Sequence, residues 1–135
     1  MLNNTVEVPS GKTVSLDLNG YSLTVADSAG NHIYAINNKG VLTLKNSEST
    51  GSIVSRGIYN GYDGSSVDGT VAGAKLIVES GAYVAQDANG GAAIFNCAEL
   101  IINGGTFQGK VAAVNNRSQG VATINGGTFR TGNHL

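Results

Sequence analysis

The sequence predicts an all-β fold in which the chain winds as a parallel solenoid of short, stacked coils. The first observation is a repeat, because Ile102-Asn-Gly-Gly-Thr-Phe107 recurs letter for letter as Ile124-Asn-Gly-Gly-Thr-Phe129, 22 residues later. A unit this short cannot bury its own apolar face, so it must stack on neighbouring units. The second observation is the alternation of apolar and polar residues, as at Val14, Leu16 and Leu18, which is typical of β-strands. No window keeps a helical period, so helix is a minor component at most.

Two landmarks alternate along the chain and mark the successive coils. One is an apolar residue followed by asparagine, and the other is a short strand that ends in an aliphatic residue. Together they predict about five coils of 19 to 24 residues, with one insertion at residues 61–72. The asparagine landmarks are Asn37, Asn60, Asn96 and Asn115, and the aliphatic landmarks are Leu44, Val78, Ile102 and Ile124.

Stacked coils place equivalent side chains directly above one another, which predicts columns inside the solenoid. Coils that stack at ~4.8 Å allow the asparagines to form an amide ladder with a structural role. Tyr83, Phe107 and Phe129 each follow the aliphatic landmark by five residues and predict an aromatic column, whereas Ser49 holds that position in an earlier coil. The pairs Gly104-Gly105 and Gly126-Gly127 predict tight corners, because glycine adopts positive φ at little cost.

A meander of hairpins is the competing topology. Asn-Gly occurs five times, and this dipeptide between alternating apolar runs is also a strong hairpin signal. However, the repeated unit leaves only Thr106 and Phe107 before Gln108-Gly109, which is too short for a matched hairpin strand. The coil interpretation also explains why the two landmarks alternate, so we favour it.

Three stretches of the chain carry a resemblance to a known class of repeat. Gly11-Lys-Thr-Val-Ser-Leu-Asp-Leu-Asn-Gly-Tyr-Ser-Leu-Thr-Val25, Gly40-Val-Leu-Thr-Leu-Lys-Asn-Ser47 and the two Ile-Asn-Gly-Gly-Thr-Phe units resemble the right-handed parallel β-helix repeats of pectate-lyase-like proteins. The resemblance covers nearly the whole chain and implies a single-stranded right-handed parallel β-helix. Similar repeats are found in bacterial surface proteins and in phage tail and virion proteins, and they carry enzymes, adhesins and inert spacers alike.

Composition limits the classes of partner. The chain of 135 residues is predicted to be one β-helix domain, 1–135, either complete or a fragment of a longer protein. Charged residues make up 13% of it, with 8 basic against 9 acidic, so neither nucleic acid nor an anionic membrane is an expected partner. No apolar run approaches the roughly 20 residues of a membrane span, and the first residues lack the basic and apolar pattern of a signal peptide, so none is expected in this sequence. Cys97, the single cysteine, is expected to be a small buried apolar residue.

No catalytic, metal or cofactor site is predicted. Cleavage of a polysaccharide would need clustered carboxylates, and the predicted alignment places no two of the nine acids in one column. It stacks Glu79 between Lys45 and Asn103 as a surface charge pair. Calcium at the insertion is disfavoured because its spacing fails the EF-hand pattern, and His32 and His134 have no cysteine partner for zinc.

Recognition is predicted at the insertion, because long loops on rigid supports are common binding sites. Tyr59 and Tyr62 would supply an aromatic face, and Asp63 and Asp68 would supply acceptors, a combination suited to a sugar ring. The alternatives are an unadorned glycine-rich loop and a contact between subunits.

The sequence therefore favours a non-enzymatic structural or adhesive module, as in a phage virion component or a bacterial cell-surface adhesin. The expected location is the virion or the cell surface. A carbohydrate-binding or polysaccharide-degrading domain is the alternative. Because the first and last coils lack caps, we expect self-association or a larger parent assembly, and the resemblance to phage fibres suggests a trimer.

Overall fold

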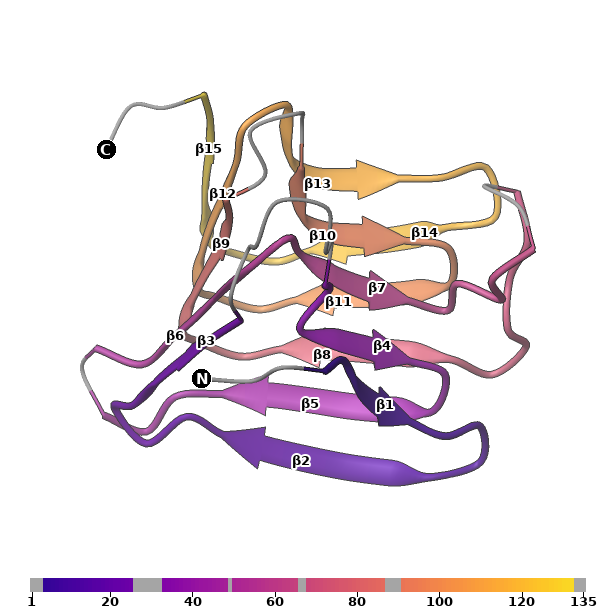
Figure 1. Ribbon diagram of the computed structural model, residues 1–135, viewed down its shortest axis with the longest axis horizontal. Coiled ribbons are helices and arrows are strands. Elements are labelled where there is room, and N and C mark those ends of the chain that lie inside the picture. Colours follow the sequence, from indigo (N-terminus) through magenta and orange to yellow (C-terminus); the bar gives the residue numbers. More distant parts are fainter. Residues whose placement is uncertain (1–3, 26–32, 49, 66–67, 87–90, 133–135) are drawn as a thin grey trace.

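The computed structural model describes residues 4–25, 33–48, 50–65, 68–86 and 91–132. In this part of the chain the fold is a parallel β-solenoid without helices, as the sequence predicts (Figure 1). The chain lays down one strand in each of three sheets per turn, so every sheet has five strands. The path from β1 to β13 completes four turns, slightly fewer than the predicted five coils, and β14 and β15 continue beyond them.

The three sheets are defined by their strands in spatial order. The first sheet contains β1 (Val6–Val8), β4 (Ile36–Asn38), β7 (Ile58–Asn60), β10 (Ala92–Asn96) and β13 (Ala112–Asn116). The second sheet contains β2 (Thr13–Asp17), β5 (Val41–Lys45), β8 (Lys75–Val78), β11 (Glu99–Ile102) and β14 (Val121–Ile124). The third sheet contains β3 (Ser22–Thr24), β6 (Ser52–Ser55), β9 (Ala82–Ala85), β12 (Thr106–Gly109) and β15 (Thr128–Thr131).

Every strand pair between the described strands is parallel, which rules out the hairpin meander. The turn lengths vary more than predicted. In the first sheet, equivalent residues are Val6, Ile36, Ile58, Ile94 and Val114, which gives turns of 30, 22, 36 and 20 residues. The longest turn includes the predicted insertion. Strand positions are fixed by stacking, whereas the connecting loops lie outside the stack and tolerate extra length.

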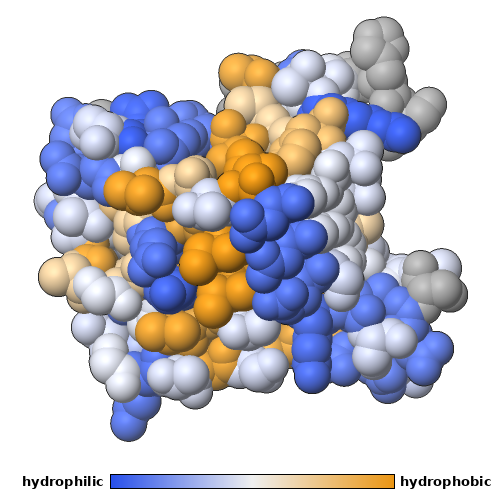
Figure 2. Space-filling view, turned by 180° about the vertical axis from the view of Figure 1, so that it is seen from behind, coloured by the Kyte–Doolittle hydropathy of each residue, from blue (hydrophilic) through white to orange (hydrophobic). Residues whose placement is uncertain are grey.

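The core follows from the alternation of each strand. In the three central strands of the second sheet, every second side chain points inward and is completely or almost completely buried, whereas the intervening ones face outward. The inward residues of its three central strands are Leu42, Leu44, Leu76, Val78, Leu100 and Ile102. Figure 2 shows the opposite side of the molecule from Figure 1, where a narrow apolar stripe runs between hydrophilic borders.

An amide ladder runs through the interior of the first sheet. Asn38 Nδ2 donates to Asn60 Oδ1 at 2.9 Å, Asn60 Nδ2 donates to Asn96 Oδ1 at 2.7 Å, and Asn96 Nδ2 donates to Asn116 Oδ1 at 2.7 Å. The first three side chains are fully buried. Each amide therefore satisfies the next, as the stacked geometry predicts.

The prediction of the ladder was wrong by one residue at two of its four positions. Asn37 pairs in register with Tyr59, and Asn115 pairs with Phe95, so both asparagines lie on the outer side of the sheet. Asparagine occurs twice in succession at both places, and the landmark selected the first of each pair. Because a strand alternates between two faces, a shift of one residue exchanges inside for outside.

The aromatic column inside the third sheet is confirmed. Tyr83 and Phe107 stack with ring centroids 5.4 Å apart, and Phe107 and Phe129 stack at 5.2 Å. Tyr83 and Phe107 are buried, whereas Phe129 in the last strand is partly exposed. Ser49, predicted for the equivalent position, lies outside the described residues, and the register places Ile53 opposite Tyr83.

The glycine corners also form. Gly105 and Gly127, the second glycine of each predicted pair, have φ of +103° and +109°. The first glycine has a different role, because a Cβ on Gly104 would lie 2.6 Å from the carbonyl oxygen of Glu79. Coils therefore approach too closely at this corner for any larger residue.

Candidate functional site

Aromatic side chains gather on the outer face of the first sheet. In β7, Ile58 and Asn60 point inward, so Tyr59 between them faces outward. The register places Phe95 of the next coil beside Tyr59. Two rings from the flanking turns complete what we call the aromatic cluster, which consists of Tyr34, Tyr59, Tyr62 and Phe95.

Tyr59 lies at the centre of this cluster. Its ring stacks on Tyr34 with centroids 3.7 Å apart and on Tyr62 with centroids 4.6 Å apart. Two stacked rings cannot share one face of Tyr59, so both of its faces are covered. Phe95 meets the edge of the stack, at 5.2 Å from Tyr59 and at 6.2 Å from Tyr62. Burial, followed by a hydrogen bond with Tyr34, raises the pKa of the Tyr59 phenol, which stays neutral at physiological pH.

Two arginines flank the aromatic cluster. The Arg56 guanidinium lies 5.5 Å from the centroid of the Tyr34 ring, and the Arg117 guanidinium lies 5.2 Å from the centroid of Phe95. These distances are typical of cation–π contacts, worth ~0.5 to 1 kcal/mol at exposed sites. All of these side chains are partly exposed. The surface thus combines apolar rings with positive charge.

A groove of about 250 Å³ runs along the tyrosines. Its polar wall contains the ion pair between Lys39 and Glu7, at 3.5 Å, and the Thr5 hydroxyl, which donates to the carbonyl oxygen of Tyr34 at 2.7 Å. Asn37 Oδ1 is buried and has no hydrogen-bond partner among the described residues. Such an acceptor is costly to leave unpaired, and a ligand hydroxyl could satisfy it. The lining residues are Thr5, Glu7, Tyr34, Asn37, Lys39, Tyr59, Tyr62 and Gly64.

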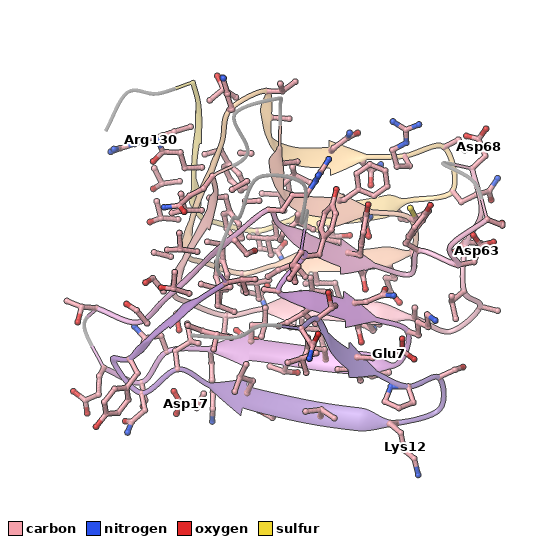
Figure 3. All side chains as sticks on the ribbon, in the orientation of Figure 1. Glu7, Lys12, Asp17, Asp63, Asp68 and Arg130 are labelled. Atoms are coloured by element: carbon pink, nitrogen blue, oxygen red, sulfur yellow. The ribbon has the colours of Figure 1, made fainter. Side chains whose placement is uncertain are left out.

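The two acidic residues of the predicted site lie in the loop beyond β7 rather than among the rings (Figure 3). Asp63 Oδ1 accepts hydrogen bonds from the backbone N–H and the hydroxyl of Ser65, both at 2.8 Å. Asp68 Oδ1 accepts a 2.7 Å bond from Ser118, which is 50 residues away in sequence. Asp68 therefore ties the loop to the turn after β13, and the use of either carboxylate as a ligand acceptor stays a prediction.

Sequence reasoning identified Tyr59 and Tyr62 but missed Tyr34, Phe95 and the groove. The signal for Phe95 was present, because Phe95 precedes a ladder asparagine just as Tyr59 does. No comparable signal marks Tyr34, which lies in the irregular segment before β4.

The remaining candidate residues are dispersed. Cys97 is buried, as predicted, and this burial raises the pKa of its thiol. Glu79 accepts a bond from Asn103 at 3.1 Å, its predicted neighbour in the column, whereas the predicted ion pair of Glu79 with Lys45 stays a prediction. His32 and His134 lie outside the described residues. Among the residues that are described, no three histidine, cysteine or acidic side chains cluster as metal ligands, and no helix could cross a membrane.

Comparison of the chain with protein-family models, with curated proteins and with solved structures gives no match. The aromatic cluster and its groove are therefore the features from which a function can be inferred.

Proposed function

We propose that this chain is a non-enzymatic structural and adhesive β-solenoid module that presents the aromatic cluster to a partner surface. It would act at the surface of a phage virion or of a bacterial cell, the settings in which repeats of the resembling pectate-lyase-like class occur. One observation carries the proposal: four aromatic rings flanked by two arginines lie on the outer face of the first sheet.

These rings are not needed to stack the coils. The ladders and the buried core lie on the inner sides of the sheets, whereas the aromatic cluster lies outside them. Aromatic residues and arginine are also the residue types that contribute most to binding at protein surfaces. A rigid solenoid would hold them in a fixed arrangement, which lowers the entropic cost of binding.

The groove favours a carbohydrate as the ligand. A sugar ring has an apolar face that stacks on aromatic rings and hydroxyls that donate hydrogen bonds. Tyr62 is the better candidate for the stacking contact, because both faces of Tyr59 are covered by other rings. Asn37 Oδ1 would accept a hydroxyl hydrogen, and the Lys39–Glu7 pair lies on the same groove.

The proposal is tested by screening the full chain on an array of immobilised oligosaccharides and titrating the strongest binder by calorimetry. We expect Tyr62→Ala to weaken that binding about tenfold or more, the size of effect typical of a central aromatic contact. Tyr21→Ala is the matched control, because Tyr21 is 74% exposed and is not part of the aromatic cluster. Unchanged affinity in Tyr62→Ala, or equal losses in both variants, would remove the glycan site. A chain that binds neither the array nor bacterial and host cell surfaces would contradict the adhesive role.

A further inference from the structure

The outer face of the second sheet is exposed at its centre, in strands that have a neighbour on both sides. These strands are β5, β8 and β11, and their outward side chains alternate with the buried ones of the core. In Figure 1, β8 and β11 lie behind β4 and β7, so the view from behind in Figure 2 looks onto this face. We call it the stripe face. Its outward residues are Val41, Thr43, Lys45, Lys75, Ile77, Glu79, Glu99, Ile101 and Asn103.

The central column of the stripe face is apolar. Ile77 pairs in register with Ile101 of the next coil and with Thr43 of the preceding one. Both isoleucines are partly exposed. Figure 2 shows a continuous apolar stripe on this side, with hydrophilic borders. Because the two isoleucines are contiguous, covering them would remove a joint apolar surface from water.

The two borders of the stripe carry charges at defined positions. On one border, Lys75 Nζ lies 3.2 Å from Glu99 Oε1. On the other, Asn103 Nδ2 donates to Glu79 Oε1 at 3.1 Å. Within a single coil, Lys75 and Glu79 therefore flank Ile77, with a cation on one side of the stripe and an anion on the other.

A second copy of this face matches it in charge. Rotation about a two-fold axis that runs parallel to the solenoid over the central column reverses the strands but keeps the coils in order. The two borders are thereby exchanged. Lys75 of each copy then lies opposite Glu79 of the other, and Ile77 lies opposite Ile77 of the other copy.

The neighbouring coils are compatible with the same axis. One coil further, Glu99 lies opposite Asn103 of the other copy, whose amide can donate to the carboxylate. One coil earlier, Lys45 lies opposite Val41, on which the aliphatic part of the lysine can pack. Among these three strands, no like charges meet.

The other two-fold arrangement, with the axis along the strands, matches less well. If that axis runs between β8 and β11, it sets Lys75 opposite Glu99, with which Lys75 is already paired within its own chain. Glu79 lies opposite Asn103 and gains no cation. The axis parallel to the solenoid is therefore the better match.

We propose that two copies of this chain pack side by side through the stripe face, related by a two-fold axis parallel to the solenoid. The contact is isologous, so it closes as a dimer. It differs from the trimer that the resemblance to phage fibres suggests. The aromatic cluster lies on the first sheet, so this dimer does not depend on the proposed recognition of a glycan.

The size of the face sets the expected strength of the dimer. Five strands ~4.8 Å apart, with about four residues of ~3.3 Å each, give an outline of roughly 24 by 13 Å. This is smaller than the ~800 Å² per partner of a standard interface. We therefore expect a weak dimer with a dissociation constant in the micromolar range.

Sedimentation equilibrium of the full chain at concentrations up to about 1 mM tests for this dimer. The wild-type protein is expected to pass from monomer to dimer and to stop there. Ile77→Lys should abolish the dimer, because it places like charges opposite each other at the centre of the contact. Val84→Lys is the matched control, since Val84 is a partly exposed outward residue in the middle of the third sheet. It should leave the dimer unchanged.

Charge exchange tests the direction of the axis. Lys75→Glu and Glu79→Lys each set like charges opposite each other in a homodimer, so each alone should weaken dimerisation roughly tenfold. A mixture of the two variants restores both opposite pairs and should form a 1:1 heterodimer about as tightly as the wild type. With the axis along the strands, Glu79→Lys would face only Asn103 and would dimerise normally.

Several results would overturn the proposal. These are a wild type that stays monomeric throughout, a trimer or a mass that keeps rising with concentration, and a dimer that survives Ile77→Lys. Normal dimerisation of Glu79→Lys, or a mixture that forms no heterodimer, would contradict the proposed axis. Circular dichroism checks that each variant folds, and Ile101→Lys replaces Ile77→Lys if the latter does not.

Discussion

The molecule contains two groups of stacked aromatic rings, one inside the third sheet and one outside the first. The inner column of Tyr83, Phe107 and Phe129 has centroid separations of 5.4 and 5.2 Å, one ring per coil. In the outer group, Tyr59 stacks on Tyr34 at 3.7 Å. Judged by ring geometry alone, the two groups look alike. They differ in what surrounds them, since Tyr83 and Phe107 of the inner column are buried in the core, whereas all four outer rings are partly exposed and two of them contact arginine.

This difference predicts which group stabilises the fold more. The inner rings occupy the same position in successive coils, in register with one another. Of the outer rings, Tyr59 and Phe95 are register partners in successive coils, whereas Tyr34 and Tyr62 lie outside the strands. Stacking of coils accounts for the whole inner column but does not account for Tyr34 and Tyr62 in the outer cluster.

The largest loss of stability is expected for a substitution in the inner aromatic column. Phe107→Ala should lower the free energy of unfolding by about 3 to 5 kcal/mol, because it removes a fully buried ring and leaves a cavity between two other rings. Phe129→Ala is the control in the same column, and its partly exposed ring should cost only about 1 to 2 kcal/mol. Urea denaturation measures both. Equal losses would mean that the burial of a ring does not determine how much that ring contributes to the free energy of unfolding.

A smaller loss of stability is expected for a substitution in the amide ladder. Here a buried polar side chain is compared with one at the surface. Asn96→Leu should cost about 1 to 3 kcal/mol, because Asn60 and Asn116 each lose a bond to it at 2.7 Å. Glu99→Gln, in the next strand of the same coil, should cost less than about 1 kcal/mol, because its ion pair with Lys75 lies at the surface. The melting temperatures of both variants test this prediction. Similar, small shifts would argue against a stabilising ladder.

The repeated hexapeptide explains how much of the fold was predictable. It fixes the register of β11 with β14 and of β12 with β15, so the parallel stacking and the aromatic column follow from the sequence. The ladder was predicted with two of four members shifted, because the doubled asparagines leave two equivalent choices of register. Loop lengths were underestimated because nothing in stacking limits a segment outside the sheets.

The candidate site was less predictable than the fold. Tyr59 and Tyr62 could be found because they adjoin the insertion, but the cluster depends on contacts between different coils. Tyr34 reaches Tyr59 from the preceding coil, and nothing in its local sequence marks it as outward-facing. The hydrogen bond of Asp68 to Ser118, 50 residues away in sequence, could not be predicted either, and ligand binding by Asp68 stays a prediction.

We propose that the aromatic rings inside the solenoid stabilise the fold, whereas those outside are available for recognition. The most direct measurement is the free energy of unfolding of Phe95→Ala, compared in the same urea series with Phe107→Ala. Both changes remove one phenylalanine ring from a β-strand, one on the outer face and one in the core. We predict a loss of about 1 to 1.5 kcal/mol for Phe95→Ala, the contribution of an aromatic pair contact. A loss as large as that of Phe107→Ala would contradict the claim, because it would make the outer cluster part of what stabilises the fold.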